Sequence, residues 1–422
     1  MNTVVVLDER RCYLALSVVC VGVLMNSLNS TIVSVALPTI GAELGFSSNS
    51  LAWVVNAYLV AYGSCLLLAG RLGDLFGHRN MLGAGAALFA TSSLACGLAH
   101  TPGLLIGARA LQGVGGAMIS AIGLSLIAKI FLAVDKRAMA LGAYALVSAS
   151  GSSAGMLLGG VMTSELNWQW TFLVHVPVGI GLCMCCLMVL PTDSRTMSNG
   201  PRELIPLCLF RKYSLLLAAC AGALLSTVAL TWTFFSALYL QRLLHWSALQ
   251  TGLIFVPANV ATAIASFALT PRMIARFGIG PPLFHGFALA AVGLLMLDAR
   301  LTATAEPVDV LPGMLLIGLG IGLTYSPTIL GALRDTATAQ AGTVSGIINT
   351  AFAVGGAIGL AVLVSIATAR SDELLSVGAT LPVALEAGYQ RAFHSGAMLA
   401  ATGCLIGAML LKSKHRATAS RN

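Results

Sequence analysis

The sequence predicts an all-α integral membrane protein whose twelve transmembrane helices form two pseudo-symmetric six-helix bundles. Of its 422 residues, 57% are hydrophobic and only 9% are charged, whereas soluble domains average about 45–50% apolar and about 25% charged residues. Twelve apolar segments are each long enough to cross roughly 30 Å of hydrocarbon, which takes about 20 residues. A weak internal repeat relates the two halves of the chain. These three observations together predict the fold.

The twelve apolar segments follow one another along the whole chain, separated by hydrophilic connections. We expect transmembrane helices near residues 13–37, 50–70, 81–100, 103–128, 138–163, 171–190, 214–240, 249–270, 282–299, 311–331, 343–368 and 393–411.

The basic residues alternate between the two sides of this predicted arrangement. Eighteen of the 23 Lys and Arg residues fall in the odd-numbered hydrophilic segments, which include both chain ends. Arg242, Arg300, Arg370 and Arg391 fall in the even-numbered segments, and Arg109 falls inside a span. Because basic residues concentrate on the cytoplasmic side, we predict a multi-pass protein of the cell membrane with both termini in the cytoplasm. The same distribution accounts for the net charge of +8 without a nucleic-acid partner.

A hydrophilic segment divides the chain into two halves of six spans. We expect an N-terminal six-helix bundle over residues 1–190 and a cytoplasmic linker over residues 191–213. The C-terminal bundle then occupies residues 214–422 and ends in a short cytoplasmic tail.

The two halves carry a trace of one repeated unit. A shift of 201 residues superimposes Arg71 on Arg272, and it also superimposes Gly77 on Gly278. Two halves related by an axis along the membrane normal leave such a trace in transporters, whose binding site lies between the halves.

Polar side chains in the first and fourth spans predict a cavity inside the protein. Asn26 and Asn29 lie in the first span, and Arg109 and Gln112 lie one helical turn apart in the fourth. Polar groups are costly in hydrocarbon, so they face a bundle interior or a water-filled space. We therefore expect these four side chains to line a substrate cavity. For Arg109, which lies close to the outer end of its span, the alternative is a side chain that reaches the membrane surface.

Aromatic residues inside the second and seventh spans are further candidates for the cavity wall. Ordinary helix packing is the alternative for each of them. The candidates are Tyr58, Tyr62, Trp232, Phe235 and Tyr239.

The connection between the second and third predicted spans combines glycines with charged residues. Glycines permit a tight turn and close helix approach, and an acidic residue there can pair with a base or with a helix N-terminus. We expect a gate loop that differs between conformational states, with an ordinary charged turn as the alternative. The residues concerned are Gly70, Arg71, Gly73, Asp74, Gly77 and Arg79.

The fifth predicted span carries glycines at a spacing of about four residues. Small residues at this spacing let helices approach closely, so they predict a packing surface. A hinge or sliding surface is an added hypothesis. The glycines are Gly151, Gly155, Gly159 and Gly160.

The sequence contains no motif for catalysis, a metal or a cofactor. H-E-x-x-H pairs, P-loops and pairs of buried carboxylates are all missing. The cysteines lie mostly within spans and do not form a ligand pattern. We therefore expect neither enzymatic activity nor a metal nor a cofactor.

Several of these stretches together resemble the signature motifs of the major facilitator superfamily. The chain is most similar to the EmrB/QacA-type branch of drug:proton antiporters. This resemblance implies alternating access between two six-helix bundles, export of small organic compounds and coupling to protons. The matching stretches are Leu28–Ile40, Gly70–Arg79, Arg109–Gly116, Gly151–Gly160 and Trp168–Phe172, with a further similar stretch at Gly342–Gly359.

Three features depart from the pattern that the resemblance implies. The branch commonly has fourteen spans, and it has a carboxylate where this chain has Asn29 and a proline where it has Met156. An amide takes up no proton at physiological pH, so proton coupling would require another titratable group. His175 and His285 are candidates, with a structural role as the alternative.

We therefore expect a monomeric secondary transporter that exports small organic molecules, with protons and the lipid bilayer as its other partners. An importer, a facilitator and a non-transporting membrane sensor or scaffold remain alternatives. A cavity with Arg109 and without fixed negative charge favours neutral or anionic compounds over strongly cationic ones.

Overall fold

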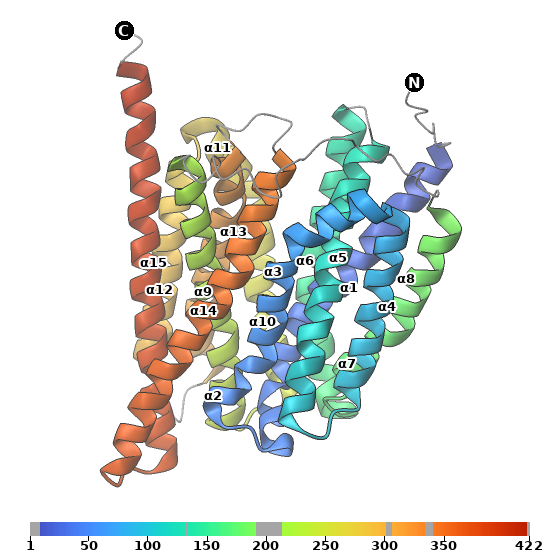
Figure 1. Ribbon diagram of the computed structural model, residues 1–422. Helices are drawn as coiled ribbons and strands as arrows, with labels where there is room; N and C mark the ends of the chain where they lie inside the picture. The colour runs from blue at the N-terminus through green and yellow to red at the C-terminus, as the bar shows by residue number, and fades with distance from the viewer. Residues whose placement is uncertain (1–8, 132–133, 191–212, 301–305, 334–340, 420–422) are drawn as a thin grey trace.

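The computed structural model describes residues 9–131, 134–190, 213–300, 306–333 and 341–419. These residues form helices and short connections, without a β-strand among them (Figure 1). The helices of the first half are α1 (Glu9–Leu44), α2 (Ser48–Leu51), α3 (Trp53–Phe76), α4 (His78–Gly97), α5 (Pro102–Ile130), α6 (Val134–Glu165), α7 (Trp170–Leu173) and α8 (His175–Val189). Those of the second half are α9 (Tyr213–Arg242), α10 (Ala248–Ile264), the π-helical turn η2 (Ala265–Leu269), α11 (Thr270–Phe277), α12 (Gly280–Arg300), α13 (Pro307–Leu333), α14 (Ala341–Ser376) and α15 (Leu381–Ala419).

The helices in the described part of the chain make twelve passes along the molecule. α2 and α3 share one pass, α7 and α8 share another, and α10, η2 and α11 share a third. Ten of the described passes are long and apolar enough to cross a membrane. The other two are α4 and α6, in which Gly, Ala and Ser dilute the larger apolar residues. The predicted all-α membrane fold is confirmed.

Each half of the chain packs into a bundle of its own. In the first half α1 packs on α6, α3 packs on α5, and α4 lies between α5 and α8. In the second half α12 lies between α13 and α15, and α14 packs on α9 and α15. The bundles meet through α6 with α10 and α3 with α14. Residues 191–212 of the predicted linker lie outside the described residues, and its last residue, Tyr213, begins α9.

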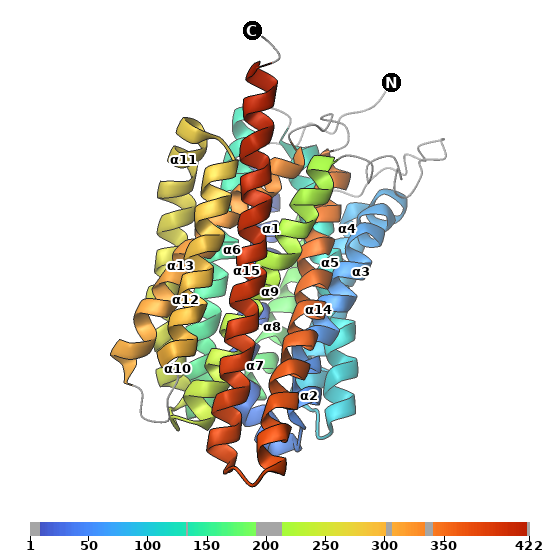
Figure 2. The same ribbon diagram turned by 90° about the vertical axis from the view of Figure 1, so that its left-hand side faces the viewer.

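The start of α1 and the end of α15 lie at the same end of the molecule (Figure 1, Figure 2). This is the arrangement that an even number of passes requires. We call it the terminal end, and we call the opposite end, near α2 and α7, the far end.

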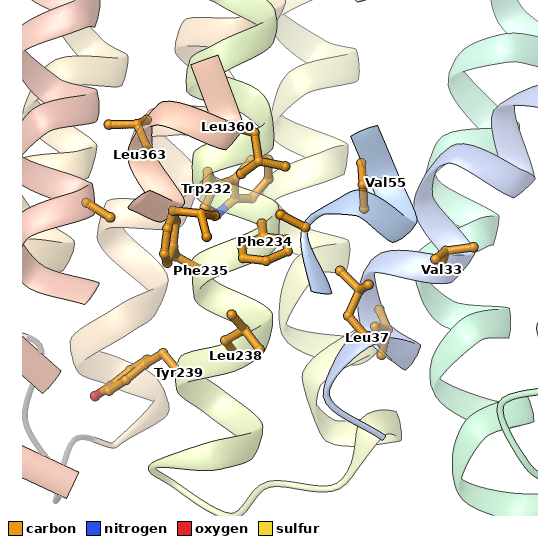
Figure 3. Packing of buried hydrophobic residues seen from close by; sticks show 14 of the residues in the cluster. Val33, Leu37, Val55, Trp232, Phe234, Phe235, Leu238, Tyr239, Leu360 and Leu363 are labelled. Atoms are coloured by element: carbon orange, nitrogen blue, oxygen red, sulfur yellow. The ribbon is translucent and has the colours of Figure 1, made fainter. Parts of the chain in front are cut away.

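The buried apolar residues join the two bundles at the far end. One cluster contains residues of both bundles: Val33, Leu37 and Val55 of the first lie opposite Phe234 and Leu238 of the second (Figure 3). Towards the terminal end the buried residues form two smaller clusters, one drawn from the first half of the chain and one from α9, α13 and α14, against which Leu67 of α3 also packs. The bundles are therefore packed together most extensively at the far end.

A single glycine turns the chain between the second and third passes. α3 continues to Phe76, so only Gly77 separates it from α4. The predicted loop Gly70–Arg79 is therefore wrong in extent, because charged residues beyond the apolar span remain helical. Gly77 has φ 89°, and Gly278, its partner in the sequence repeat, has φ 87°. Only glycine adopts this region readily, so the repeat preserves the conformation of the turn.

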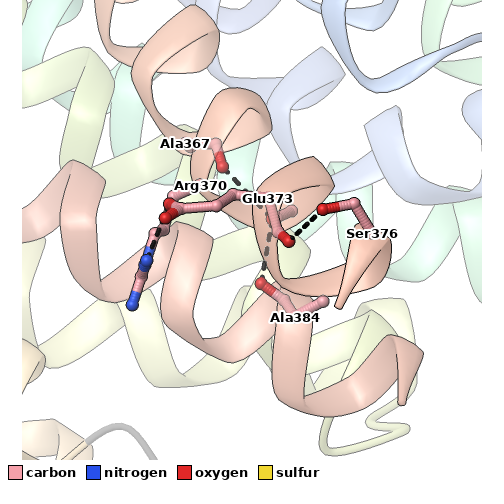
Figure 4. Close-up of polar contacts among 6 residues, drawn as sticks. Ala367, Arg370, Glu373, Ser376 and Ala384 are labelled. Atoms are coloured by element: carbon pink, nitrogen blue, oxygen red, sulfur yellow. Dashed lines mark hydrogen bonds and ion pairs between the residues drawn. The ribbon is translucent and has the colours of Figure 1, made fainter. Parts of the chain in front are cut away.

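Helices α14 and α15 extend well beyond the predicted spans and form a helical hairpin at the far end (Figure 4). The Ser371 hydroxyl of α14 donates to the backbone oxygen of Ala384 at 2.9 Å. Arg370 pairs with Glu373 on the surface of α14 at 2.7 Å. The prediction ended the span of α14 too early and began that of α15 too late, because hydropathy marks the hydrocarbon boundary, whereas these contacts keep the chain helical beyond it.

Candidate functional site

Arg109 lies in the interior of the N-terminal bundle, where α1, α3 and α5 meet. Its residue surface is only 1% exposed. The Nε atom donates to the backbone oxygen of Val54 at 2.8 Å. One terminal nitrogen donates to Oδ1 of Asn29 at 3.1 Å and also to Oε1 of Gln112. These bonds exclude the alternative in which Arg109 reaches the membrane surface.

The charge of Arg109 has no buried acidic partner among the described residues, because none of their buried side chains is Asp or Glu. Instead the guanidinium carbon lies 4.5 Å from the ring centre of Tyr58 and 5.8 Å from that of Phe172. Carbonyl oxygens, amide oxygens and aromatic faces stabilise a cation but leave its charge uncompensated. The N-terminal bundle therefore holds a buried positive charge.

The predicted polar residues of the first span are enclosed in the same region. Asn26 donates to the backbone oxygen of Gly116 at 2.9 Å and to the Ser120 hydroxyl at 2.7 Å, and it accepts from the Tyr58 hydroxyl at 2.9 Å. Asn29 is fully buried, and its Nδ2 atom has no hydrogen-bond partner among the described residues. The four polar side chains lie together inside one bundle in this conformation, and their place in a substrate cavity stays a prediction.

Beside the predicted Tyr62, the structure places two tyrosines that the sequence did not suggest as cavity residues, Tyr144 and Tyr325. Tyr62 stacks on Tyr58, with ring centres 5.8 Å apart. Tyr62 and Tyr144 of α6 pack against the same apolar cluster of the N-terminal bundle, and the ring of Tyr325 of α13 lies 5.4 Å from that of Phe352 of α14. Tyr325 is 47% exposed although its helix crosses the molecule. A single tyrosine in an otherwise apolar span was the available signal in both α6 and α13.

The three aromatic candidates of the seventh span lie in the far-end cluster (Figure 3). Trp232, Phe235 and Tyr239 are each buried, and the Trp232 ring lies 5.3 Å from that of Phe255. Phe235 packs within its own bundle, against Phe393 at 6.2 Å. In this conformation they are core residues, and their place in a cavity wall stays a prediction.

The residues of the predicted gate loop lie where α3, α4 and α5 meet. A Cβ atom at Gly73 would lie 2.1 Å from Cδ1 of Ile122, so a larger residue there would require the Ile122 side chain to shift. The Arg79 guanidinium donates to the backbone oxygen of Leu187, which joins α4 to α8. Gly70 and Arg71 are part of α3. The side chain of Asp74 lies outside the described residues, and the gating role stays a prediction.

His78, which the sequence did not single out, is buried where the same helices meet. Its Nε2 atom lies 2.9 Å from the Ser125 hydroxyl, and its Nδ1 atom lies 3.3 Å from the Lys129 ammonium group. These contacts tie the start of α4 to the end of α5.

The glycines of α6 form a packing surface, as predicted. A Cβ atom at Gly155 would lie 2.1 Å from the Thr31 hydroxyl of α1, and one at Gly151 would lie 2.9 Å from Cβ of Ser27. Gly159 faces α1 in the same way. Gly160 instead faces α10, where a Cβ would lie 2.8 Å from the backbone oxygen of Ala248. Helix α6 is thus held between the bundles.

We expect Gly155→Leu to destabilise the protein strongly, because a leucine side chain there must displace α1. Overpacking of this kind costs about 1–3 kcal/mol, so the thermal unfolding temperature in detergent should fall clearly. Gly107→Leu in α5 is the matched control, since nothing lies within 4 Å of a Cβ at that position. An unchanged unfolding temperature for Gly155→Leu would contradict the close packing of α1 on α6.

The two histidine candidates lie in different surroundings. His175, at the start of α8, is 2% exposed and packs 5.8 Å from the ring of Phe89, and neither ring nitrogen has a hydrogen-bond partner among the described residues. His285 of α12 is exposed, and its Nδ1 atom lies 2.7 Å from the backbone oxygen of Pro281. Of the two, only His175 lies in the interior with Arg109.

Residues 19–360 match the family model described as Major Facilitator Superfamily. The chain is 31% identical to a puromycin resistance protein of Streptomyces alboniger, over 89% of this chain and 86% of that protein. It is 29% identical to the cephamycin export protein of Amycolatopsis lactamdurans, over 83% and 84% of the two chains. It is 28% identical to a tetracenomycin C resistance and export protein of Streptomyces glaucescens, over 82% and 74%.

Solved structures share the fold at low sequence identity. A bacterial homologue of the human lysosomal transporter Spinster, in an inward-facing and unoccupied conformation, superimposes with a TM-score of 0.75 at 15% identity, over 96% of this chain and 98% of that one. A nucleoside transporter superimposes with a TM-score of 0.76 at 11% identity, over 94% and 99%.

Proposed function

Because the chain belongs to the major facilitator superfamily, we propose that it is a secondary transporter that exports small organic compounds across the cell membrane. One observation carries this proposal: relatives named for antibiotic resistance or export align with more than four-fifths of the chain. The half-exposed Tyr325 between the bundles supplies a surface on which such a compound can bind.

The packing of the bundles supports a conformation that opens towards the terminal end. The large cluster shared by both bundles closes the far end, whereas near the terminal end the clusters are smaller and Leu67 of α3 is the residue of the N-terminal bundle that packs against the C-terminal cluster. With both termini in the cytoplasm, as the basic residues predict, the open side faces the cytoplasm. An exporter takes up its substrate in this state.

The buried charge of Arg109 supports a preference among substrates. No buried Asp or Glu balances it in the described part of the chain, and its field extends through a medium of low polarity. Neutral and anionic compounds should therefore be exported better than strongly cationic ones.

Proton coupling through His175 completes the proposed mechanism. The carboxylate typical of the branch is replaced by Asn29, which takes up no proton, and His175 is the buried imidazole nearest this region. The lack of a buried carboxylate among the described side chains also favours a second candidate function, a facilitator that moves its substrate down a gradient only.

Transport by inside-out vesicles tests the function and the coupling separately. We expect accumulation of puromycin, cephamycin or tetracenomycin C above that in vesicles without the protein, and we expect a protonophore to abolish it. If no compound accumulates or equilibrates faster than in the empty control, the export proposal is wrong. Facilitated flux that a protonophore leaves unchanged would support the facilitator instead.

We expect His175→Gln to abolish proton-driven accumulation and to leave downhill flux within about twofold of the wild-type rate. Glutamine retains a hydrogen-bonding side chain but cannot be protonated. His285→Gln serves as the control, because His285 is exposed on α12. Accumulation at the wild-type level in His175→Gln would remove His175 from the coupling mechanism.

A further inference from the structure

Four aromatic rings from four helices converge between the bundles. Tyr62 of α3 and Tyr144 of α6 come from the N-terminal bundle, and Tyr325 of α13 and Phe352 of α14 come from the C-terminal bundle. The rings of Tyr325 and Phe352 lie 5.4 Å apart at an interplanar angle of 38°. Tyr62 and Tyr144 pack against the same apolar cluster of the N-terminal bundle. The Thr350 hydroxyl, two residues before Phe352, donates to the backbone oxygen of Gly63, next to Tyr62, at 3.0 Å. Each bundle thus contributes two rings to one place.

The exposure of Tyr325 shows that this place is hollow. Its ring contacts Phe352 of α14, the helix that packs on α3 of the opposite bundle, yet 47% of the residue surface is exposed. Tyr62 and Tyr144 are also only partly buried. A residue surrounded by both bundles can keep this much accessible surface only if space separates them there.

The backbone near Tyr325 is irregular in its own helix, α13, and in the neighbouring turn η2. Pro327, two residues after Tyr325, lies inside α13 and cannot donate a helical hydrogen bond. The π-helical turn η2 packs on the same helix, where Ser266 and Thr270 donate to the backbone oxygen of Gly322 at 3.2 and 3.1 Å. Irregular backbone within a membrane is tolerated where it lines a cavity, and π-turns are frequent at functional sites.

The chemistry of the four rings selects the ligand. Aromatic faces stack on planar rings, and the three phenol groups can donate and accept hydrogen bonds. Tyr62 also stacks on Tyr58, whose ring contacts the Arg109 cation at 4.5 Å. This positive charge opposes the binding of a cation nearby.

We propose that Tyr62, Tyr144, Tyr325 and Phe352 form a binding subsite for planar, uncharged aromatic compounds that bear hydrogen-bonding groups. The subsite deepens the proposed export function and rests on it for its physiological role. Because both bundles supply rings, a bound compound contacts both halves. Any rocking of the bundles changes the subsite, so binding and conformational change are linked.

Equilibrium dialysis of the protein in nanodiscs tests the subsite without relying on transport. The probe is 7-amino-4-methylcoumarin, which is planar and neutral, and empty nanodiscs give the background. We expect saturable binding by the wild type, with a Kd raised about tenfold by Tyr325→Ala or Tyr144→Ala, because each substitution removes a stacking surface. Tyr325→Phe keeps the ring and should change the Kd less than threefold. Ethidium, a planar cation, should bind at least tenfold more weakly than the coumarin.

Tyr213→Ala is the matched control, because Tyr213 is 65% exposed at the start of α9. Thermal unfolding of each variant shows that it is folded, and Tyr325→Phe provides a test that preserves the packing. The subsite is wrong if the wild type shows no saturable binding, or if folded Tyr325→Ala and Tyr144→Ala bind the coumarin with the wild-type Kd.

The outcomes distinguish this inference from the export proposal. Coumarin binding that depends on the tyrosines, in a protein that transports nothing, would support the subsite and overturn export. If the protein exports puromycin but the tyrosine substitutions leave its Kd for the coumarin unchanged, export is supported and the subsite is overturned.

Discussion

Replacing Arg109 by leucine is expected to reduce transport to the level of empty vesicles and to destabilise the protein by several kcal/mol. Leucine leaves the amide oxygens of Asn29 and Gln112 without their donor, and it removes the bond to the backbone oxygen of Val54, which keeps its helical partner in α3. Each buried acceptor without a partner costs about 1–3 kcal/mol. Removing a buried charge also relieves its desolvation penalty, which offsets part of this loss. The free energy of unfolding should therefore fall by on the order of 3 kcal/mol.

The loss of transport should exceed what the loss of stability explains. Arg109 links α1, α3 and α5 through one side chain, so its removal uncouples helices that must move as one bundle. Arg300→Leu is the control, because it removes an arginine whose side chain is 64% exposed and pairs with Asp309 at 3.1 Å on the surface. Surface pairs of this kind contribute about 0–1 kcal/mol. Wild-type unfolding temperature and transport rate in Arg109→Leu would show that the buried network is dispensable.

Replacing Asn29 by aspartate is expected to stabilise the protein and to make its stability depend on pH. The substituted carboxylate would lie where Oδ1 of Asn29 now accepts from Arg109 at 3.1 Å. It would also remove the Nδ2 group that has no partner among the described residues. Hydrogen bonds to charged groups contribute about 1.5–3 kcal/mol, so a gain on the order of 2 kcal/mol is expected for the ionised form.

The sign of the pH dependence follows from the ion pair. The stabilising carboxylate is the ionised form, so the gain should be present at high pH and lost as acidification protonates it. Thermal unfolding of Asn29→Asp and the wild type across a pH series measures the difference. The negative charge should also offset Arg109, so export of ethidium relative to a neutral coumarin should rise.

Asn26→Asp provides a matched control, with the same chemical change expected to act in the opposite direction. The Asn26 amide donates to the backbone oxygen of Gly116 and to Ser120, and an aspartate would lose these donors and place a negative charge against a carbonyl oxygen. It should therefore destabilise the protein. If both substitutions destabilise it equally, the environment of Asn29 is not the charge-selective one described above.

Much of the architecture could be predicted from the sequence, because a bilayer imposes strong rules on a chain. Spans of about 20 apolar residues are required by the thickness of the hydrocarbon, and the helical passes agree with them. The pair Gly77 and Gly278 was recognisable because a turn with positive φ restricts the residue type. The glycines of α6 likewise predicted close packing, because only small residues permit it.

The contents of the site were decided by the tertiary structure. Sequence placed Arg109 in a span but did not show that its partners are a carbonyl and two amides inside one bundle. It also predicted Phe235 as a cavity residue, although the Phe235 side chain is buried in the core. It did not predict Tyr144 or Tyr325, which lie between the bundles. The physical reason is that lipid and protein interior are equally apolar, so the hydrophobic pattern of a membrane helix carries little information about which face meets a neighbouring helix. Hydrophobicity thus determined which segments cross the membrane, and the packing of one bundle against the other decided which side chains meet between them.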